Sequence, residues 1–157
     1  MGIRQLRVKE DEILRKKAKP VKEISNGTMT LIDDMWDTLL ETNGVGLAAP
    51  QVGILRRIVV MEVEEEKYEL INPVIVSQEG EWNSEEACLS VPGLCGDVMR
   101  PFSIVVEAQN RDGESFTVEA EEYLASVFCH EIDHLDGVIY LDKATNVRPY
   151  DPDNEGE

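Results

Sequence analysis

The residues best suited to chemistry in this chain are its only two histidines, which stand four apart in the segment HEIDH, residues 130–134. On a helix, side chains four positions apart project from one face, so His130 and His134 could hold a single metal ion. Glu131 would then lie beside that metal as a general base. Two hydrogen-bonded core histidines are the alternative, but each would need its own polar partner on an apolar face. We therefore predict one divalent metal ion per chain.

A catalytic metal site of this kind needs a third protein ligand and an open position for water. Asp133 and Asp136 point away from the histidine face of the expected helix. Cys129 is turned from His130 by roughly 100° around the helix axis. Cys88 is a better candidate, because it lies in EEACLSVPG, a segment of small and turn-forming residues from which a thiolate could approach a distant helix. A buried thiol that binds no metal is the alternative for a single cysteine.

A third stretch, GVGLAAPQVG at residues 44–53, has the look of a dinucleotide-binding turn. Such a turn requires a strand before it and a helix after it, because the helix N-terminus holds the pyrophosphate. Here the preceding segment has apolar pairs at helical spacing and ends in the stop signal Asn43-Gly44, and a β-rich segment follows. The turn therefore joins a helix to a strand, and we reject the nucleotide-binding hypothesis.

Hydrophobic periodicity predicts the elements that must position these residues. A short helix is expected near residues 11–18, ending at Lys19-Pro20, and an amphipathic helix at about 28–42 with Ser25 or Asn26 as its cap. Residues 55–120 are rich in Val, Ile and Glu, which favours mostly antiparallel sheet. Turns are expected at 72–73, 78–80 and 110–113. We predict an α+β fold, in which antiparallel or mixed sheets pack around a C-terminal helix that carries HEIDH.

That C-terminal helix is expected over residues 121–137, from a pair of glutamates to Gly137. At 100° per residue it has one core-facing stripe, which contains both histidines and Glu131. The stripe comprises Tyr123, Leu124, Val127, Phe128, His130, Glu131, His134 and Leu135. Four residues fall on the other side: Ser126, Cys129, Asp133 and Asp136.

The length of 157 residues predicts a single domain, which we place at residues 1–147, followed by a polar acidic tail at 148–157 that we expect to be frayed. A formal net charge of −17 argues against direct binding of nucleic acid, since phosphate contacts need a basic face. No apolar run is long enough to span a membrane, and the first twelve residues lack the apolar core of a signal peptide. Three cysteines without an export signal favour reduced thiols. We expect a cytoplasmic protein that does not bind membranes.

The segments GVGLAAPQVG, EACLS and HEIDH, in this order, resemble the three sequence motifs of the peptide deformylase family, and the resemblance covers nearly the whole chain. It implies a metal-dependent hydrolase that removes the formyl group from the N-terminal formyl-methionine of newly made polypeptides and releases formate. The metal ligands that it implies are Cys88, His130 and His134. The implied catalytic groups are Glu131 as general base, with the Gln51 side chain and the Leu89 backbone N–H as oxyanion donors.

The resemblance also implies the substrate, the metal and a supporting ion pair. The peptide backbone would pair as an added strand near Val45. Ferrous iron is implied as the functional metal, which Zn²⁺, Ni²⁺ or Co²⁺ could replace. Glu86 is expected to pair with Arg100 beside the Cys88 loop. We further expect a monomer, whose partners are N-formylmethionyl peptides. The substrate-binding residues implied are Val45, Gly46, Tyr123 and Val127.

Three departures from the family pattern affect these expectations. Ala87 stands where the family usually has glycine, so a positive φ angle at this position would be strained. Cys95 stands where many relatives carry an arginine near the bound peptide. The chain ends in DPDNEGE instead of a basic helix, so any transient ribosome contact would not use a basic C-terminal helix.

Two alternative functions are compatible with parts of this pattern. A zinc endopeptidase shares H-E-x-x-H, but its third ligand is normally a downstream histidine or glutamate, and no histidine follows His134. A relative that binds metal or peptide without catalysis would have no need of Glu131 and Gln51, since neither is a metal ligand in the implied site.

Overall fold

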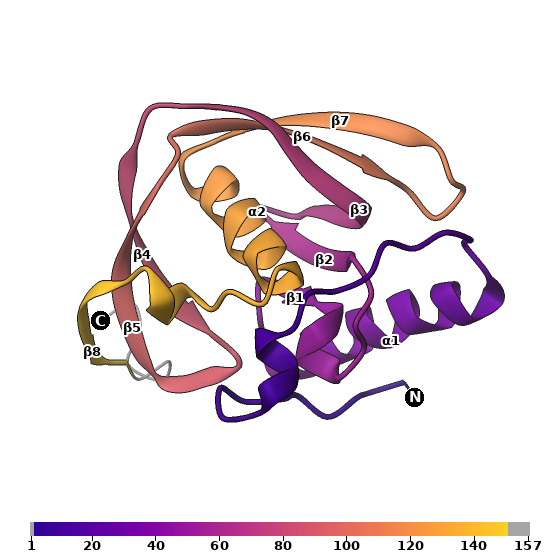
Figure 1. Ribbon diagram of the computed structural model, residues 1–157, viewed down its shortest axis with the longest axis horizontal. Helices are drawn as coiled ribbons and strands as arrows, with labels where there is room; N and C mark the ends of the chain where they lie inside the picture. Colours follow the sequence, from indigo (N-terminus) through magenta and orange to yellow (C-terminus); the bar gives the residue numbers. More distant parts are fainter. Residues whose placement is uncertain (1, 151–157) are drawn as a thin grey trace.

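Two antiparallel sheets and a helix between them form the fold of the computed structural model, which describes residues 2–150 (Figure 1). One sheet has the strand order β1-β2-β3-β6-β7, with β1 Gly46–Ala48, β2 Ile58–Val63, β3 Glu66–Glu79, β6 Ser103–Gln109 and β7 Ser115–Glu121. The other has the order β4-β5-β8, with β4 Trp82–Cys88, β5 Val91–Arg100 and β8 Thr145–Pro149. Helix α2, Glu122–Leu135, lies between them. The predicted α+β class is confirmed.

Helix α1, Asn26–Thr42, packs beside β1 and β2 of the larger sheet. The Ser25 side chain caps it by accepting a hydrogen bond from the backbone N–H of Thr28 at 3.3 Å. The helix ends at Asn43, which has a left-handed φ of 56°. The apolar residues of its buried face pack in the same cluster as β1 and β2; they are Leu31, Ile32, Met35 and Leu39. The sequence prediction of this helix is confirmed, with a start two residues earlier.

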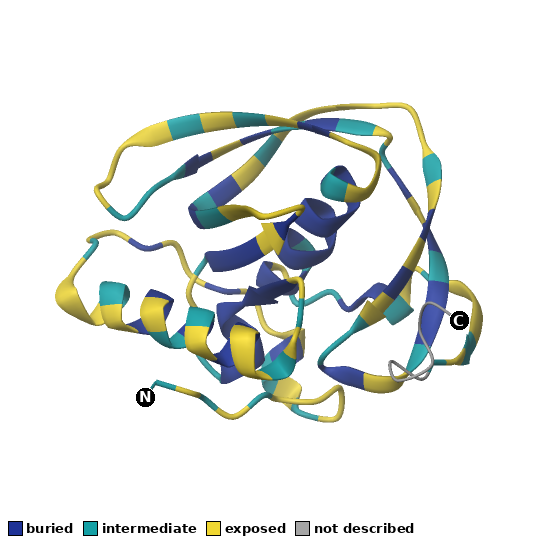
Figure 2. Ribbon diagram, turned by 180° about the vertical axis from the view of Figure 1, so that it is seen from behind, coloured by how far each residue is buried: buried dark blue, intermediate teal, exposed yellow. Residues whose placement is uncertain are grey.

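Helix α2 is more deeply buried than one apolar stripe would allow (Figure 2). Ser126 and Cys129, which the sequence places on the side opposite the histidines, are only 2% and 5% exposed. The predicted division of the helix into two sides does not by itself show that the second side is also covered; here the Trp82 indole N–H, at the start of β4, donates to Ser126 Oγ at 2.9 Å. Within residues 2–150, no helix combines the length and the apolar character needed to cross a membrane. The metal-binding motif thus lies on a helix that is enclosed by both sheets.

Two further expectations need correction. Asn72-Pro73 is not a turn but lies within β3, where the pairing with β6 shifts register and the Asn72 side chain bonds both backbone groups of Val21. Arg148 and Pro149 belong to β8 and pair with β5, so the frayed tail does not begin at residue 148. Backbone pairing along a sheet edge does not require apolar side chains, which is why the polar composition was misleading. Residues 151–157 of the expected tail lie outside the described residues.

The two other predicted turns are confirmed, and the predicted short helix is present in a shorter form. Strand β3 ends at Glu79 and Gly80 takes a φ of 69°, and residues 110–113 connect β6 to β7 as a hairpin. The short helix expected before Pro20 is a single 3-10 turn, η1, Glu12–Arg15. Two more short 3-10 helices are η2, Ala49–Val52, and η3, Tyr140–Asp142.

Candidate functional site

The three predicted metal ligands converge from two elements. Cys88 ends β4, while His130 and His134 lie one turn apart on α2, and one potential ligand atom from each residue lies within 4.8 Å of the others. Cys88 Sγ is 3.3 Å from His134 Nε2. A thiolate with two imidazoles is a donor set that suits Zn²⁺, Fe²⁺, Co²⁺ or Ni²⁺. The geometry therefore places three potential ligand atoms where they could hold one divalent ion.

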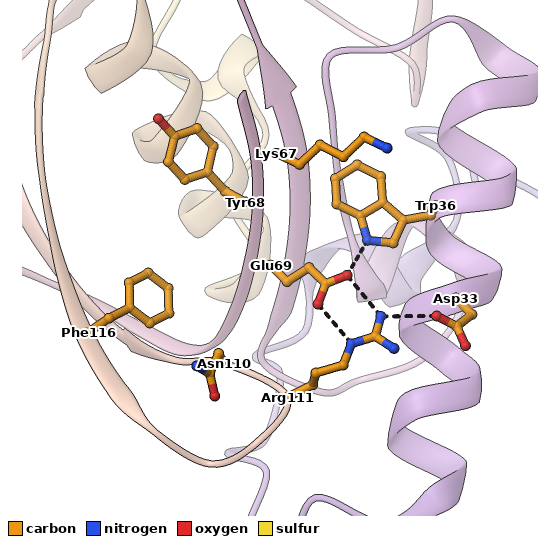
Figure 3. Close-up of a pocket in the computed structure, with 8 residues that line it drawn as sticks. All are labelled: Asp33, Trp36, Lys67, Tyr68, Glu69, Asn110, Arg111 and Phe116. Atoms are coloured by element: carbon orange, nitrogen blue, oxygen red, sulfur yellow. Dashed lines mark hydrogen bonds and ion pairs between the residues drawn. The ribbon is translucent and has the colours of Figure 1, made fainter. Parts of the chain in front are cut away.

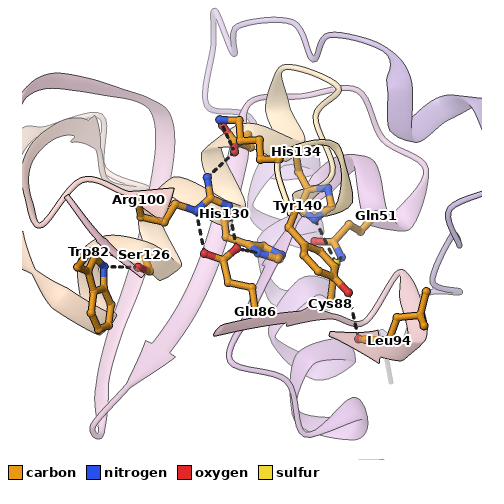
Figure 4. Close-up of polar contacts among 12 residues, drawn as sticks. Gln51, Trp82, Glu86, Cys88, Leu94, Arg100, Ser126, His130, His134 and Tyr140 are labelled. Atoms are coloured by element: carbon orange, nitrogen blue, oxygen red, sulfur yellow. Dashed lines mark hydrogen bonds and ion pairs between the residues drawn. The ribbon is translucent and has the colours of Figure 1, made fainter. Parts of the chain in front are cut away.

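The orientation of His130 is set by a buried ion network (Figure 4). His130 Nδ1 is 2.9 Å from Glu86 Oε1, which directs Nε2 toward the metal group. Glu86 also accepts two hydrogen bonds from Arg100, at 2.7 and 2.8 Å, and Arg100 Nη1 donates to Asp133 at 2.7 Å. Burial alone would raise the pKa of Glu86, but the hydrogen bonds from Arg100 and His130 lower it to about 2. The Glu86–Arg100 pair expected from the resemblance is confirmed.

Replacing Glu86 by glutamine should lower the free energy of unfolding of the metal-free protein by about 3 kcal/mol, because it leaves a buried guanidinium with one anionic partner fewer. Urea denaturation at pH 7 measures this. Glu85→Gln is the matched control, since Glu85 pairs with Arg148 at the surface and should change stability by less than about 1 kcal/mol.

The pH dependence of the same measurement provides a second check. The pKa of Glu86 is about 2 in the folded protein and 4.5 in its ordinary state. The contribution of the Glu86 carboxylate to the free energy of unfolding is therefore fully present above about pH 4.5 and is lost as the pH falls toward 2. The difference in the free energy of unfolding between wild type and Glu86→Gln should become smaller over that pH range. A difference that is absent at pH 7, or that does not change on acidification, would contradict the structural role of this carboxylate.

Glu131 has the environment of a proton-transfer group. It is 5% exposed, and its Oε1 atom has no hydrogen-bond partner within residues 2–150. Burial raises its pKa to about 7, which suits a group that must gain and lose a proton near neutral pH. A Cβ atom on Gly46 would lie 2.7 Å from Glu131 Oε2. Glycine at position 46 therefore makes room for this carboxylate.

The stretch GVGLAAPQVG brings a side-chain amide to the same group. It forms β1 and η2, in which Gln51 is 1% exposed. Gln51 Oε1 accepts from the backbone N–H of Ala48 at 2.9 Å, and Nε2 donates to Ser90 Oγ at 3.1 Å. Nε2 also lies 3.7 Å from Cys88 Sγ. This turn thus places a side-chain amide beside Cys88, one of the metal-ligand candidates.

Leu89 lies in the short turn between β4 and β5, directly after Cys88. A Cβ atom on Gly44 would meet the Leu89 side chain at 2.6 Å, so the first and second motifs pack against each other here. Ala87 does not adopt a positive φ angle, so alanine causes no backbone strain at this position. Cys95 is buried on β5 opposite Ala87.

Two of the residues expected to bind substrate, Tyr123 and Val127, lie on α2 in line with Glu131. Tyr123, Val127 and Glu131 are four residues apart along α2, so their side chains follow each other along the helix. Tyr123 is 49% exposed, whereas Val127 is 8% exposed and Val45, directly before β1, is 38% exposed. Tyr123 and Val45 are thus accessible from solvent, whereas Val127 is buried.

Three residues at this site were not identified from the sequence. Ser90 bonds the Gln51 amide, Asp133 extends the Arg100 network, and the Tyr140 ring stacks on His130. Asp133 could have been found from its place inside HEIDH, although the sequence places it correctly away from the metal. Ser90 could have been considered because it lies two residues after Cys88. Tyr140 lies in no sequence pattern that would connect it with the site.

A separate surface pocket of about 580 Å³ lies between α1, β3 and the β6–β7 hairpin (Figure 3). Three of its charged groups already pair with one another, since Arg111 contacts Glu69 at 2.8 Å and Asp33 at 3.0 Å. The Trp36 indole N–H donates to the same glutamate. None of the three metal-ligand candidates lines this pocket. This pocket is therefore separate from the three metal-ligand candidates.

Comparison with known proteins agrees with this geometry. The family model described as polypeptide deformylase matches residues 3–150. The peptide deformylase of Acetivibrio thermocellus is 56% identical over 143 residues, which is 91% of this chain and 84% of that protein. The crystal structure of peptide deformylase from Thermotoga maritima has a TM-score of 0.89 at 41% identity, covering 91% of this chain and 98% of that one. A peptide deformylase from Synechococcus elongatus in complex with actinonin has a TM-score of 0.89 at 35% identity, covering 93% and 81%.

Proposed function

Because the chain belongs to the polypeptide deformylase family, we propose that Cys88, His130 and His134 hold its catalytic metal. As a deformylase, the protein is a metal-dependent hydrolase that removes the formyl group from nascent peptides. The observation that carries the site assignment is the convergence of these three ligand atoms beside the unpartnered carboxylate of Glu131. Formate release that requires one equivalent of divalent metal per chain tests it.

The chemistry divides between the metal and the residues around it. When bound, the metal supplies Lewis-acid chemistry, which polarises a carbonyl oxygen and lowers the pKa of a water molecule. Glu131 takes a proton from the attacking water, whose oxygen adds to the formyl carbon. The same carboxyl group then gives that proton to the nitrogen as the C–N bond breaks. Formate and a free N-terminal amine result.

Two donors would stabilise the negative charge that develops on the formyl oxygen. Gln51 Nε2 lies 3.7 Å from the Cys88 sulfur, and Ser90 holds the amide in that direction. The backbone N–H of Leu89 is the second donor in our proposal. Donors that are fixed before the reaction need no reorganisation in the transition state, and one such donor contributes on the order of 3 kcal/mol.

The substrate-binding residues that we propose are Val45, Gly46, Tyr123 and Val127. The methionine side chain would enter along the α2 face that leads to Glu131. Strand β1 is the terminal strand of its sheet, so the edge away from β2 has no strand partner in the described part of the chain. A peptide could pair with that edge as an added strand and present its formyl group to the metal.

We further propose that the protein acts as a monomer in the cytoplasm, on N-formylmethionyl peptides as they are made. Its formal charge of −17 disfavours a stable complex with ribosomal RNA, and contact with the ribosome would be transient. Catalysis then depends on encounter with a free peptide N-terminus.

Ferrous iron is the functional metal in this proposal. Zinc strongly prefers four ligands, whereas ferrous iron, cobalt and nickel accept a fifth more readily, and the reaction asks the site to accommodate both water and substrate. Protein loaded with Fe²⁺ without oxygen should therefore deformylate formyl-Met-Ala faster than the zinc form. Its activity should decay in air as the metal and the Cys88 thiolate oxidise. Equal kcat/KM for fully loaded iron and zinc samples would contradict the preference for iron.

A further inference from the structure

Tyr140 makes two contacts that join separate parts of the metal group. It lies in η3, five residues after the end of α2, and is 1% exposed. Its ring stacks on the ring of His130, with centroids 5.8 Å apart and an interplanar angle of 22°. Its hydroxyl donates to the backbone carbonyl of Leu94 at 3.0 Å (Figure 4). One side chain thus contacts a ligand on the helix and the backbone of β5.

Strand β5 is the partner of β4, which carries the third ligand, Cys88. The buried cluster around Tyr140 includes Val91 and Val98 of β5, and both Cys88 and Leu94 pack against it. Tyr140 therefore connects the hairpin that provides the thiolate to the helix that provides the imidazoles. No motif in the sequence includes this residue.

The stacking contact complements the hydrogen bond that His130 makes with Glu86. That hydrogen bond holds the Nδ1 edge of the imidazole, but it does not stop the ring from rocking about the line of the bond. A second ring packed almost parallel to it opposes this motion, because tilting would break contacts over the whole ring face. The bond from Tyr140 to Leu94 in turn keeps the phenol ring in place.

We propose that Tyr140 is a positioning residue of the metal centre, which fixes the ring of His130 relative to Cys88 and so slows the loss of the metal. This inference rests on the proposed role of His130 and Cys88 as ligands. Tyr140 does not bind the metal in this proposal. Its stacked ring limits the orientations that the imidazole of His130 can adopt.

The test compares three replacements of Tyr140 with a control in the same cluster. Tyr140→Leu and Tyr140→Met remove the stack, and Tyr140→Phe keeps it but loses the bond to Leu94. Ile139→Ala is the control, because Ile139 is fully buried in the same cluster beside Tyr140 but carries no aromatic ring that could stack on His130. Two quantities are measured on folded samples: the rate at which zinc passes to an excess of chelator, and the visible absorption spectrum of the Co²⁺-loaded protein.

Tyr140→Leu and Tyr140→Met should lose zinc roughly tenfold faster than wild type and should shift the ligand-field bands of cobalt, in line with the effect of other groups that orient metal-binding histidines. Tyr140→Phe should stay within about threefold of wild type because the stack remains. Ile139→Ala should change neither quantity, although it lowers stability. If Tyr140→Leu fails to fold, Tyr140→Met gives the same comparison.

Zinc loss and cobalt spectra for Tyr140→Leu or Tyr140→Met that match those of Ile139→Ala would overturn the proposal, since Tyr140 would then be only a core residue. A Tyr140→Phe variant as impaired as the non-aromatic variants would overturn the stacking argument. A wild-type protein that shows no cobalt–thiolate absorption would instead reject Cys88 as a ligand, and with it the proposed metal group.

Discussion

Replacement of Glu131 by glutamine is expected to lower kcat for formyl-Met-Ala by a factor of about 10² to 10⁴, while the protein still binds one metal ion. Glutamine has the shape of glutamate but cannot accept the proton of the attacking water. The substitution should be well tolerated by the fold, because Glu131 Oε1 has no hydrogen-bond partner within residues 2–150. Burial raises the pKa of Glu131 to about 7, so the uncharged form is already compatible with this environment.

Formate release and metal content, measured on the same samples, distinguish loss of a base from loss of the metal. Glu119→Gln makes the same chemical change on the exposed face of β7 and should leave both quantities unchanged. A Glu131→Gln variant that keeps its metal and more than about a tenth of the wild-type kcat would rule out Glu131 as the general base.

Replacement of Cys88 by alanine is expected to weaken metal binding by at least about 100-fold, more than the loss of a supporting group would cause, and to abolish activity at equimolar metal. The two histidines that remain come from one helix, so β4 would no longer provide a ligand. Cys129→Ala is the matched control. Cys129 is also buried and adjoins His130, but burial raises its pKa to about 11, so it remains a thiol.

Titration with zinc, followed by metal analysis after gel filtration, measures the difference between the two cysteine variants. Cys129→Ala should keep one equivalent of metal even if its thermal stability falls. Retention of a full equivalent by Cys88→Ala would show that the thiolate is not a ligand. The metal would then have to be held by a different set of residues.

The features that were predictable from the sequence are those with a local pattern. The spacing of HEIDH fixed both histidines on one helical face, and the cap at Ser25 and the stop at Asn43-Gly44 defined the first helix. Cys88 could be selected only as the better candidate among several thiols and carboxylates, because its distance from the helix depends on how β4 folds back. The structure brings its sulfur to 3.3 Å from His134 Nε2.

The features that were missed depend on contacts between distant segments. Helical periodicity assumes one covered face, so it could not foresee that Ser126, which bonds Trp82 of β4, and Cys129 are buried as well. The pairing of β8 with β5 uses backbone groups, so the side-chain composition of β8 does not indicate a strand. The stacking of Tyr140 on His130 depends on the path of the chain after α2, which no periodic pattern describes.

The most direct test of the account is the product analysis of formyl-Met-Ala treated with the metal-loaded wild-type protein. We expect one formate for each peptide consumed, a free methionine amine and an intact Met–Ala bond, with no reaction in the metal-free sample. Cleavage of the peptide bond would instead indicate an endopeptidase. Fully metal-loaded protein that releases no formate above the metal-free control would contradict the proposed reaction.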